Sequence, residues 1–414
     1  MLKAQSLLFM SNFMKHLNYI ELSNFLTSTS VKQNITLSYQ VFGKTLHTAP
    51  IVLVNHALTG NSNVSGHDGW WQSIVGEGKT IDTTKYTVIS FNIPGNGYDN
   101  KPENLIENYK DFVARDIAKI FLQGLNQLNI TSIFALVGGS LGGGIAWEMA
   151  VIKPNLCKHL IVIASDWKAT DWLIANCQIQ EQLLTNSSNP VHDARMHAML
   201  CYRTPESFKA RFKRSKNEDL KIFNVESWLL HHGKKLQERF QLSAYKLMNQ
   251  LLKTIDVTKG REDAITVLDK IESNITIIGV DSDLFFTAEE NRETQKKLAA
   301  THPNVTYNEI HSVHGHDAFL IEFDQLKTII EPIFKPELVN QKMKILKFGG
   351  KSLSNENGLK EALQIIEDKI KEHLEPQLVD FEKKNQLFLE NNTIYFFITF
   401  EKISMLKKMF QNLA

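Results

Sequence analysis

A serine lies inside a run of glycines, Gly138–Gly144 (GGSLGGG), where its hydroxyl could act as a nucleophile. The run follows the apolar segment Ile133–Val137 and precedes the helix-like segment Ile145–Ala150. A serine at a sharp strand-to-helix turn needs neighbours without side chains, because the two chain segments pass close together. A phosphate-binding loop would contain Lys-Ser/Thr or G-x-G-x-x-G here, and neither pattern fits. The run therefore favours a nucleophile elbow at Ser140 over a phosphate loop or a plain tight turn.

A serine that attacks an acyl group needs N–H groups to hold the negative oxygen of the transition state. The N–H of Leu141, directly after the serine, is one expected donor. A second should come from a loop after an earlier strand. The segment Asn55–Gly60 suits this role, with the Leu58 N–H as the expected donor. Each such donor contributes about 3 kcal/mol of transition-state stabilisation. His56 in the same loop could act as a base, but a structural role is favoured.

A carboxylate that orients the base is expected further along the chain, because enzymes with this elbow have the order serine, acid, histidine. The strand-like segment Ile275–Val280 is followed by Asp281 and Asp283. A carboxylate at the end of a strand can orient an imidazole and stabilise its charged form. Position alone allows both residues, with a slight preference for Asp283.

Three histidines compete for the role of base. His311, His314 and His316 follow the strand-like segment Val305–Ile310. The expected base lies on a loop after the last strand. His316 is preferred because it comes after a glycine and directly before the helix-like segment Ala318–Ile330.

A metal site is the rival interpretation of this histidine cluster. The three imidazoles and Asp317 lie close in sequence, and zinc hydrolases use such ligands. A metal site would leave the serine–glycine run unexplained, so we expect no metal.

The candidate residues lie at the ends of segments typical of buried parallel strands, since these runs are almost continuously apolar. They are Ile51–Leu58, Tyr86–Pro94, Ile133–Ser140, His159–Ser165 and Ile275–Asp283. Helical patterns, notably Tyr109–Leu128 and Leu141–Lys153, alternate with them. This alternation predicts an α/β fold with a mostly parallel sheet flanked by helices. From about 167 to 263 the sequence is helix-like, which predicts an inserted helical lid that keeps water from the site.

Composition narrows the possible partners. The 414 residues have a formal net charge of +1, which gives no electrostatic case for nucleic acid or an anionic membrane. No apolar run approaches the ~20 residues of a membrane span. Three widely spaced cysteines suit a reducing compartment. The segment Met1–Met10 lacks the length and cleavage site of a secretory signal, so we expect a cytoplasmic protein.

Taken together, the motifs resemble the homoserine O-acetyltransferase family, whose members have the α/β-hydrolase fold. The resemblance covers residues 20–335 in one collinear order. The matching segments are Asn55–Gly60, Gly78–Thr83, Gly138–Gly143, Ala194–Met196, Cys201–Arg203, Leu229–Phe240, Asp281–Phe285 and Gly315–Leu320.

The resemblance implies specific roles for several residues. The positions that match the family triad are Ser140, Asp283 and His316. Asp317 matches the carboxylate that binds the amino group of homoserine. Arg195 matches the lid arginine that binds the substrate carboxylate, and Tyr202 lies near it in sequence. Without the resemblance, Arg195 would be interpreted as a surface residue.

The resemblance also implies the reaction. An acetyl group passes from acetyl-CoA, a co-substrate rather than a bound cofactor, to the homoserine hydroxyl through an acyl-Ser140 intermediate, in methionine biosynthesis. The family further implies a homodimer. Gly95–Pro102 departs from the family pattern, so the sequence leaves open a succinyl donor, serine as acceptor, or ester hydrolysis on the same scaffold.

The remaining residues, 343–414, have a different character. Met343–Ser352 resembles the first strand and Gly-Gly turn of aspartate kinases, and Thr393–Phe400 is β-prone. About 70 residues are too few for that catalytic domain. We expect a truncated fragment without kinase activity, or else an unrelated helical appendage.

Overall fold

The computed structural model describes residues 17–335, 347–349, 361, 364, 388–390 and 393–395. The chain separates into two compact units, residues 1–335 and 336–414. All candidate site residues lie in the first unit. The segment Met1–Met10 and most of the kinase-like segment Met343–Ser352 lie outside the described residues.

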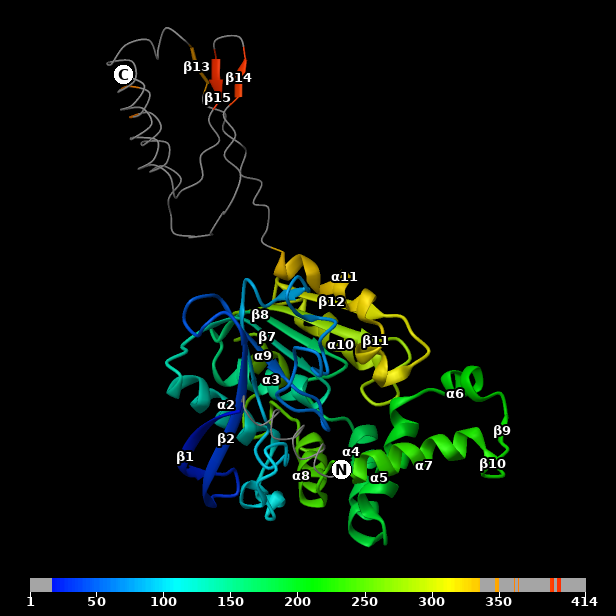
Figure 1. Cartoon of the computed structure of the whole chain (residues 1–414). Coiled ribbons are helices and arrows are strands. Elements are labelled where there is room, and N and C mark those ends of the chain that lie inside the picture. Colours follow the sequence, from blue (N-terminus) through cyan, green and yellow to red (C-terminus); the bar gives the residue numbers. More distant parts are fainter. Residues whose placement is uncertain are drawn as a thin grey trace, which may run out of the picture. The chain divides into compact units, whose positions relative to one another are not determined.

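The first unit is built on an eight-stranded sheet in the order β1-β2-β6-β3-β7-β8-β11-β12 (Figure 1). The strands are β1 (Asn18–Leu26), β2 (Lys32–Gly43), β3 (Ile51–Asn55), β6 (Thr87–Phe91), β7 (Ile133–Gly139), β8 (Cys157–Ile163), β11 (Asn274–Val280) and β12 (Val305–Ile310). From β6 to β12 every pairing is parallel, while β1 pairs antiparallel with β2 and β2 with β6. The predicted, mostly parallel sheet is confirmed. The antiparallel hairpin β1–β2 was not predicted.

Both faces of the sheet are covered, which explains why its central strands are apolar throughout. Every residue of β3 and of β6 is buried. Leu53 belongs to the apolar core that includes α2 and α3, whereas Val52 and Val54 belong to the core that includes α11. Each fully buried side chain of this size stabilises the fold by about 1.5–3 kcal/mol. In a strand that is covered on one face only, apolar residues would alternate with polar ones.

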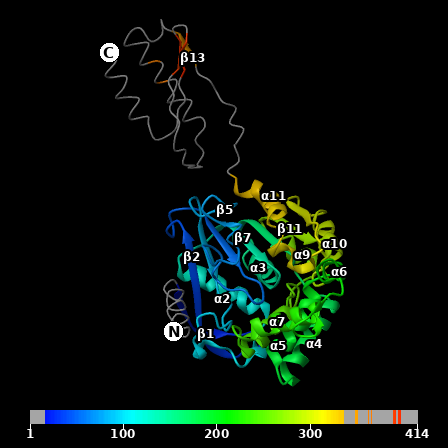
Figure 2. The same cartoon turned by 45° about the vertical axis from the view of Figure 1, so that its right-hand side comes forward.

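The helices and short elements around the sheet include α2 and α3, which can be followed in Figure 2 beside the strands. They are α2 (Ala114–Gln127), α3 (Leu141–Ile152), α9 (Ala264–Leu268), α10 (Ala288–Leu298), α11 (Phe323–Phe334), the 3-10 helices η2 (Pro102–Asn104), η3 (Tyr109–Asp111) and η4 (Gly315–Leu320), and the strands β4 (Val75–Gly76) and β5 (Ile81–Asp82). The predicted helix Tyr109–Leu128 is thus interrupted, since its first residues form η3.

A helical insertion lies between β8 and β11 (green in Figure 1), as predicted. It contains α4 (Asp171–Asn186), α5 (Pro190–Tyr202), α6 (Pro205–Phe212), α7 (Asn224–Gln237) and α8 (Leu242–Lys253). Side-chain capping fixes the starts of α4 and α6. The Thr170 side chain accepts a hydrogen bond from the Leu173 N–H, and Thr204 does the same for Ser207. A short hairpin of β9 (Lys216–Asn217) and β10 (Ile222–Phe223) interrupts the insertion and was not predicted.

In the second unit, the described residues form a small antiparallel sheet in the order β13-β15-β14. Its strands are β13 (Lys347–Gly349), β14 (Phe388–Glu390) and β15 (Thr393–Tyr395). Across the parts of the chain that the structure describes, no helix is both long and apolar enough to cross a membrane.

Candidate active site

Ser140 lies at the junction of β7 and α3 in a strained backbone conformation. Its φ is 54° and its ψ is −127°, in a region that side chains rarely adopt. The neighbouring glycines make this turn possible. A Cβ on Gly138 would lie 2.3 Å from the Gly142 oxygen, and one on Gly142 would lie 2.4 Å from the Asn55 oxygen. The glycine run is therefore required by close backbone contacts, as the elbow interpretation predicts.

The side chains of Ser140, His316 and Asp283 form a continuous hydrogen-bonded chain. Ser140 Oγ lies 2.9 Å from His316 Nε2, and His316 Nδ1 lies 2.7 Å from Asp283 Oδ2. The other carboxylate oxygen accepts hydrogen bonds from the N–H groups of Phe285 and Phe286, at 2.7 and 3.0 Å. Asp283 can only accept, so it fixes the proton on Nδ1 and leaves Nε2 free to accept the serine proton.

Four aromatic rings surround the His316 imidazole. Their centroids lie 5.1 to 5.9 Å from the imidazole centroid, and they belong to Tyr202, Phe285, Phe286 and Phe319. Both His316 and Asp283 are almost completely buried. This apolar shell holds the imidazole in one orientation and excludes water, which strengthens the electrostatic interaction between the two side chains. Nothing in the sequence spacing pointed to the shell.

The residues that competed with the triad positions have other partners. Asp281 contacts His311 at 3.1 Å, and it also accepts the Ser312 N–H at 3.0 Å. His314 Nδ1 lies 3.4 Å from Ser207 Oγ. Within the described residues, no group of three or more His, Cys, Asp or Glu side chains is arranged to hold a metal ion. His311, His314 and His316 are close in sequence but have different side-chain partners.

His316 lies within the 3-10 helix η4, so the expectation of a loop position was wrong. Gly315 begins η4 with a φ of 64°, and a Cβ there would lie 2.9 Å from the Tyr202 oxygen. The close approach of this turn to the lid, rather than a flexible loop, therefore fixes the backbone of the histidine.

The loop expected to supply an oxyanion donor is fastened to the elbow. Asn55 Nδ2 donates to the Gly142 oxygen at 3.3 Å. The His56 Nε2 accepts the Ile93 N–H at 3.0 Å, and its Nδ1 donates to the Ala57 oxygen at 2.8 Å. Burial lowers the pKa of His56 to about 4, so the ring is neutral and acts as a structural bridge.

The two expected oxyanion donors both border the site. Leu58 is buried beneath the lid, and Leu141 is the first residue of α3, where a helix leaves its N–H without an intrahelical acceptor. Among the described loops and turns, neither N–H donates to another backbone oxygen. Their action on an acyl oxygen stays a prediction.

Of the expected substrate-binding residues, Arg195 and Tyr202 belong to the lid helix α5, and Asp317 directly follows the base in η4. The Arg195 guanidinium carbon lies 5.6 Å from the centre of the Tyr202 ring, which itself packs on His316. Arg203 Nη1 lies 3.6 Å from Asp317 Oδ2. Burial raises the pKa of Asp317, and the charges of Arg195, His316 and Arg203 oppose this rise. Arg203 was not predicted as a site residue, although it directly follows Tyr202 in a matching segment.

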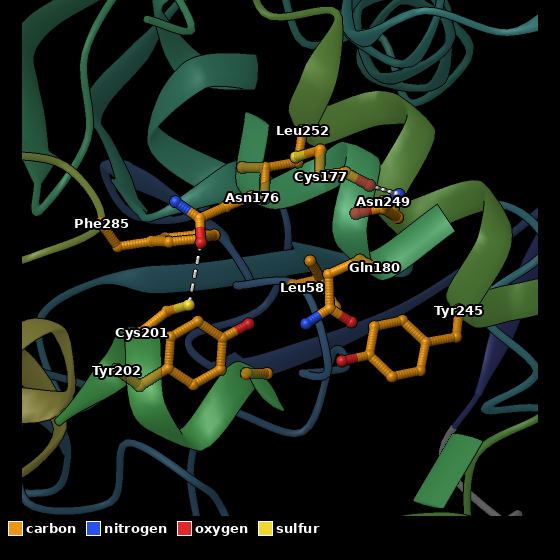
Figure 3. Close-up of a pocket in the computed structure, with 11 residues that line it drawn as sticks. Leu58, Asn176, Cys177, Gln180, Cys201, Tyr202, Tyr245, Asn249, Leu252 and Phe285 are labelled. Carbon is orange, nitrogen blue, oxygen red and sulfur yellow. Dashed lines mark hydrogen bonds between the residues drawn. The ribbon is translucent and has the colours of Figure 1, made fainter. Parts of the chain in front are cut away.

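A small cavity lies beside this site, and Figure 3 shows its lining residues. It measures about 10 Å³, and Leu58, Tyr202 and Phe285 form part of its wall. A larger groove of about 360 Å³ opens on the lid surface and includes Trp172 and Leu284. Both hollows share Asn176 and Cys201, whose side chains are hydrogen-bonded at 3.1 Å.

Comparison with known proteins agrees with this geometry. Residues 50–320 match the family model described as alpha/beta hydrolase fold. The fold and this match show that the chain belongs to the class of α/β-hydrolase-fold proteins. A homoserine O-acetyltransferase of Chloroherpeton thalassium is 32% identical over 339 residues, which cover 75% of this chain and 88% of the relative. The chain belongs to the homoserine O-acetyltransferase family.

Solved structures share the same architecture. The homoserine O-acetyltransferase of Staphylococcus aureus superposes with a TM-score of 0.67 at 25% identity, covering 79% of this chain and 97% of that one. The crystal structure of an esterase superposes with a TM-score of 0.69 at 17% identity, covering 77% and 100%. The second likeness concerns the fold alone.

Proposed function

We propose that this protein transfers the acetyl group of acetyl-CoA to the hydroxyl of L-homoserine by a ping-pong reaction through an acyl-Ser140 intermediate. The observation that carries the proposal is the Ser140–His316–Asp283 hydrogen-bonded chain, with Arg195 of the lid and Asp317 of η4 close to it. Family membership supports the choice of substrates.

The first half-reaction forms an ester on Ser140. His316 Nε2 takes the hydroxyl proton while Oγ attacks the thioester carbon, and the carbonyl electrons move onto oxygen. The N–H groups of Leu58 and Leu141 hold that oxyanion. Collapse of the intermediate breaks the C–S bond, and the leaving sulfur takes the proton from the imidazolium. Asp283 stabilises the imidazolium while it exists.

The second half-reaction transfers the acyl group to the acceptor. The Asp317 carboxylate binds the ammonium group of homoserine, and Arg195 binds its carboxylate. His316 removes the proton of the substrate hydroxyl, whose oxygen attacks the ester carbon. Ser140 Oγ then leaves and recovers the proton from the imidazolium. Transfer rather than hydrolysis requires that the buried, aromatic surroundings of His316 exclude water.

Ester hydrolysis is the second candidate, because an esterase has the same fold. An esterase needs no clamp for an amino acid, whereas Arg195 and Asp317 form a cation and an anion beside the base. This pair favours an α-amino acid acceptor. Serine and homoserine both have an α-amino and an α-carboxylate group and differ in the length of the side chain that bears the hydroxyl. The assay must therefore decide between these two acceptors.

The test is thiol release from acetyl-CoA and from succinyl-CoA, with homoserine, serine or no added acceptor. We expect release from acetyl-CoA that depends on homoserine and yields the O-acetyl ester. Equal release without an acceptor would support hydrolysis and contradict the proposal. A preference for serine or for succinyl-CoA would replace the corresponding substrate while retaining the mechanism.

We further propose that residues 343–414 are an aspartate-kinase-like segment without kinase activity, and that the protein is a cytoplasmic homodimer. Resemblance of Met343–Ser352 to an aspartate kinase supports the first proposal. ATP-dependent phosphorylation of aspartate by the full chain would contradict it. Light scattering of the full chain tests the dimer, which a monomeric mass would exclude.

A further inference from the structure

We infer that the 10 Å³ cavity beside His316 receives the alkyl end of the acyl group on Ser140, and that Leu252 and Cys177 in its wall limit this group to two carbons. This inference rests on the proposed function. It identifies residues that determine which acyl-CoA the protein uses as donor. The two residues belong to different lid helices, α8 and α4.

The position of the cavity fits an acyl group. Two of its lining rings, Tyr202 and Phe285, pack against His316 with centroids 5.5 and 5.1 Å away. Leu58, the expected source of one oxyanion N–H, also lines it. An acyl group on Ser140 lies between His316 and the oxyanion N–H groups, and the cavity shares Leu58 with the latter and two aromatic rings with the surroundings of the former. On this ground we assign the alkyl end of the acyl group to the cavity.

The size of the cavity fits a methyl group. A volume of about 10 Å³ is room for about one water-sized group. The methyl of an acetyl group is of that size. A propionyl or succinyl group adds at least one further carbon, and close-packed walls yield to an added methylene only at a considerable cost in energy.

The chemistry of the wall points the same way. No lysine, arginine or histidine is found among the described residues that line the cavity. A succinyl carboxylate would therefore be buried there without a cation, which is strongly unfavourable. A methyl group needs no partner, and the side chains of Leu58, Leu252 and Phe285 offer it apolar contacts.

The wall formed by α4 and α8 is held rigidly. Asn249 Nδ2 donates a hydrogen bond to the Cys177 oxygen at 2.9 Å, and both residues are buried. Leu252 and Cys177 are each only 1% exposed. In Figure 3 these three residues lie together on one side of the cavity. This wall cannot withdraw without breaking the packing between the two helices.

Other parts of the cavity wall are polar, with side chains of Asn176, Gln180, Tyr202 and Tyr245. Burial raises the pKa values of the Tyr202 and Tyr245 hydroxyls, and the positive charge of Arg195 only partly opposes this rise. The Tyr245 hydroxyl has no hydrogen-bond partner among the described residues. The Arg195 guanidinium lies against the Tyr202 ring, so we expect the acceptor near Tyr202, and the Leu252–Cys177 side is left for the alkyl group.

The test compares Leu252→Ala with Leu251→Ala in the full chain. Leu251 precedes Leu252 in α8 and is also buried, but it does not line the cavity. The measured quantity is kcat/KM for acetyl-, propionyl-, butyryl- and succinyl-CoA with homoserine, and thermal unfolding shows whether each variant is folded. The unmodified protein should prefer acetyl to propionyl by about 10-fold or more. Leu252→Ala should reduce this preference at least 10-fold and admit butyryl, while Leu251→Ala leaves it unchanged.

Cys177→Ala is the second variant, because it removes a single sulfur atom and disturbs the fold less. It should shift the preference toward propionyl in the same direction, by a smaller factor. The inference is overturned if neither Leu252→Ala nor Cys177→Ala changes the preference, or if the unmodified protein uses succinyl-CoA as well as acetyl-CoA. Absence of any homoserine-dependent thiol release by the unmodified protein would instead refute the proposed function itself.

Discussion

The guanidinium of Arg203 lies 3.6 Å from the carboxylate of Asp317, the residue that directly follows the proposed base. Both side chains are largely shielded from solvent, at 10% and 23% exposure. Burial alone would favour a protonated Asp317, but Arg195, His316 and Arg203 all favour the ionised form. An ionised Asp317 is what an ammonium group of a substrate requires. Arg203 is thus a positioning residue that acts through Asp317.

Removal of the Arg203 charge should make homoserine binding more sensitive to acid. In Arg203→Ala the pKa of Asp317 rises further, so the acid limb of kcat/KM for homoserine should move to higher pH. Arg203→Lys keeps the positive charge, so its acid limb should lie close to the pH found for the unmodified protein. An unchanged limb in Arg203→Ala would contradict the role.

Loss of the Asp317 charge itself should weaken the acceptor step and spare the donor step. In Asp317→Asn we expect a KM for homoserine at least about 10-fold higher, since a charged hydrogen bond is replaced by a neutral one. The acylation burst with acetyl-CoA should persist. Rapid-quench measurement of thiol release checks this, and loss of the burst would show that Asp317 acts in acylation instead.

His56 should make the fold less stable in acid. Its pKa is about 4 in the folded protein and about 6.5 when unfolded, so the unfolded state binds more protons between these values. The stabilisation is complete above pH 6.5 and declines as the pH falls toward 4. In His56→Gln the difference in unfolding free energy between pH 7 and pH 5 should shrink by about 2 kcal/mol. Denaturant titrations at the two pH values measure it, and an identical difference in both proteins would contradict the account.

Gly142 should be indispensable because it joins the elbow to the oxyanion loop. A Cβ there would lie 2.4 and 2.6 Å from the Asn55 and His56 oxygens, so Gly142→Ala must displace the loop that contains Leu58. We expect kcat to fall about 100-fold or more, as when an oxyanion donor is lost. Gly78→Ala is the control, since its Cβ would meet nothing within 4 Å and only its φ of 66° is strained. Full activity of Gly142→Ala would exclude the proposed junction.

The sequence was sufficient for the central sheet and the elbow because both depend on local pattern. Strands such as β3 and β6 are apolar at nearly every position, and Gly138 and Gly142 are required by close backbone contacts within the elbow and with one neighbouring loop. The hairpin β1–β2 was not recognised. It lies at the edge of the sheet, where exposed and buried residues are mixed in both strands.

Tertiary features of the site could not be predicted from spacing. The choice between Asp281 and Asp283 depends on which of the two carboxylates lies against His316 of η4 in the folded chain, and both candidates are the same residue type. Arg203 pairs with a residue more than a hundred positions away. The aromatic shell of His316 likewise combines residues of α5, of the segment between β11 and α10, and of η4, which only the folded chain brings together.

The central claim is that Ser140 carries the acyl group, and mass spectrometry of the acylated protein tests it most directly. After rapid mixing with acetyl-CoA in the absence of homoserine and quenching in acid, the peptide containing Ser140 should gain the mass of one acetyl group. Homoserine added before quenching should remove the label, and Ser140→Ala should never acquire it. An acetyl group found on another residue, or homoserine-dependent turnover in Ser140→Ala, would contradict the account.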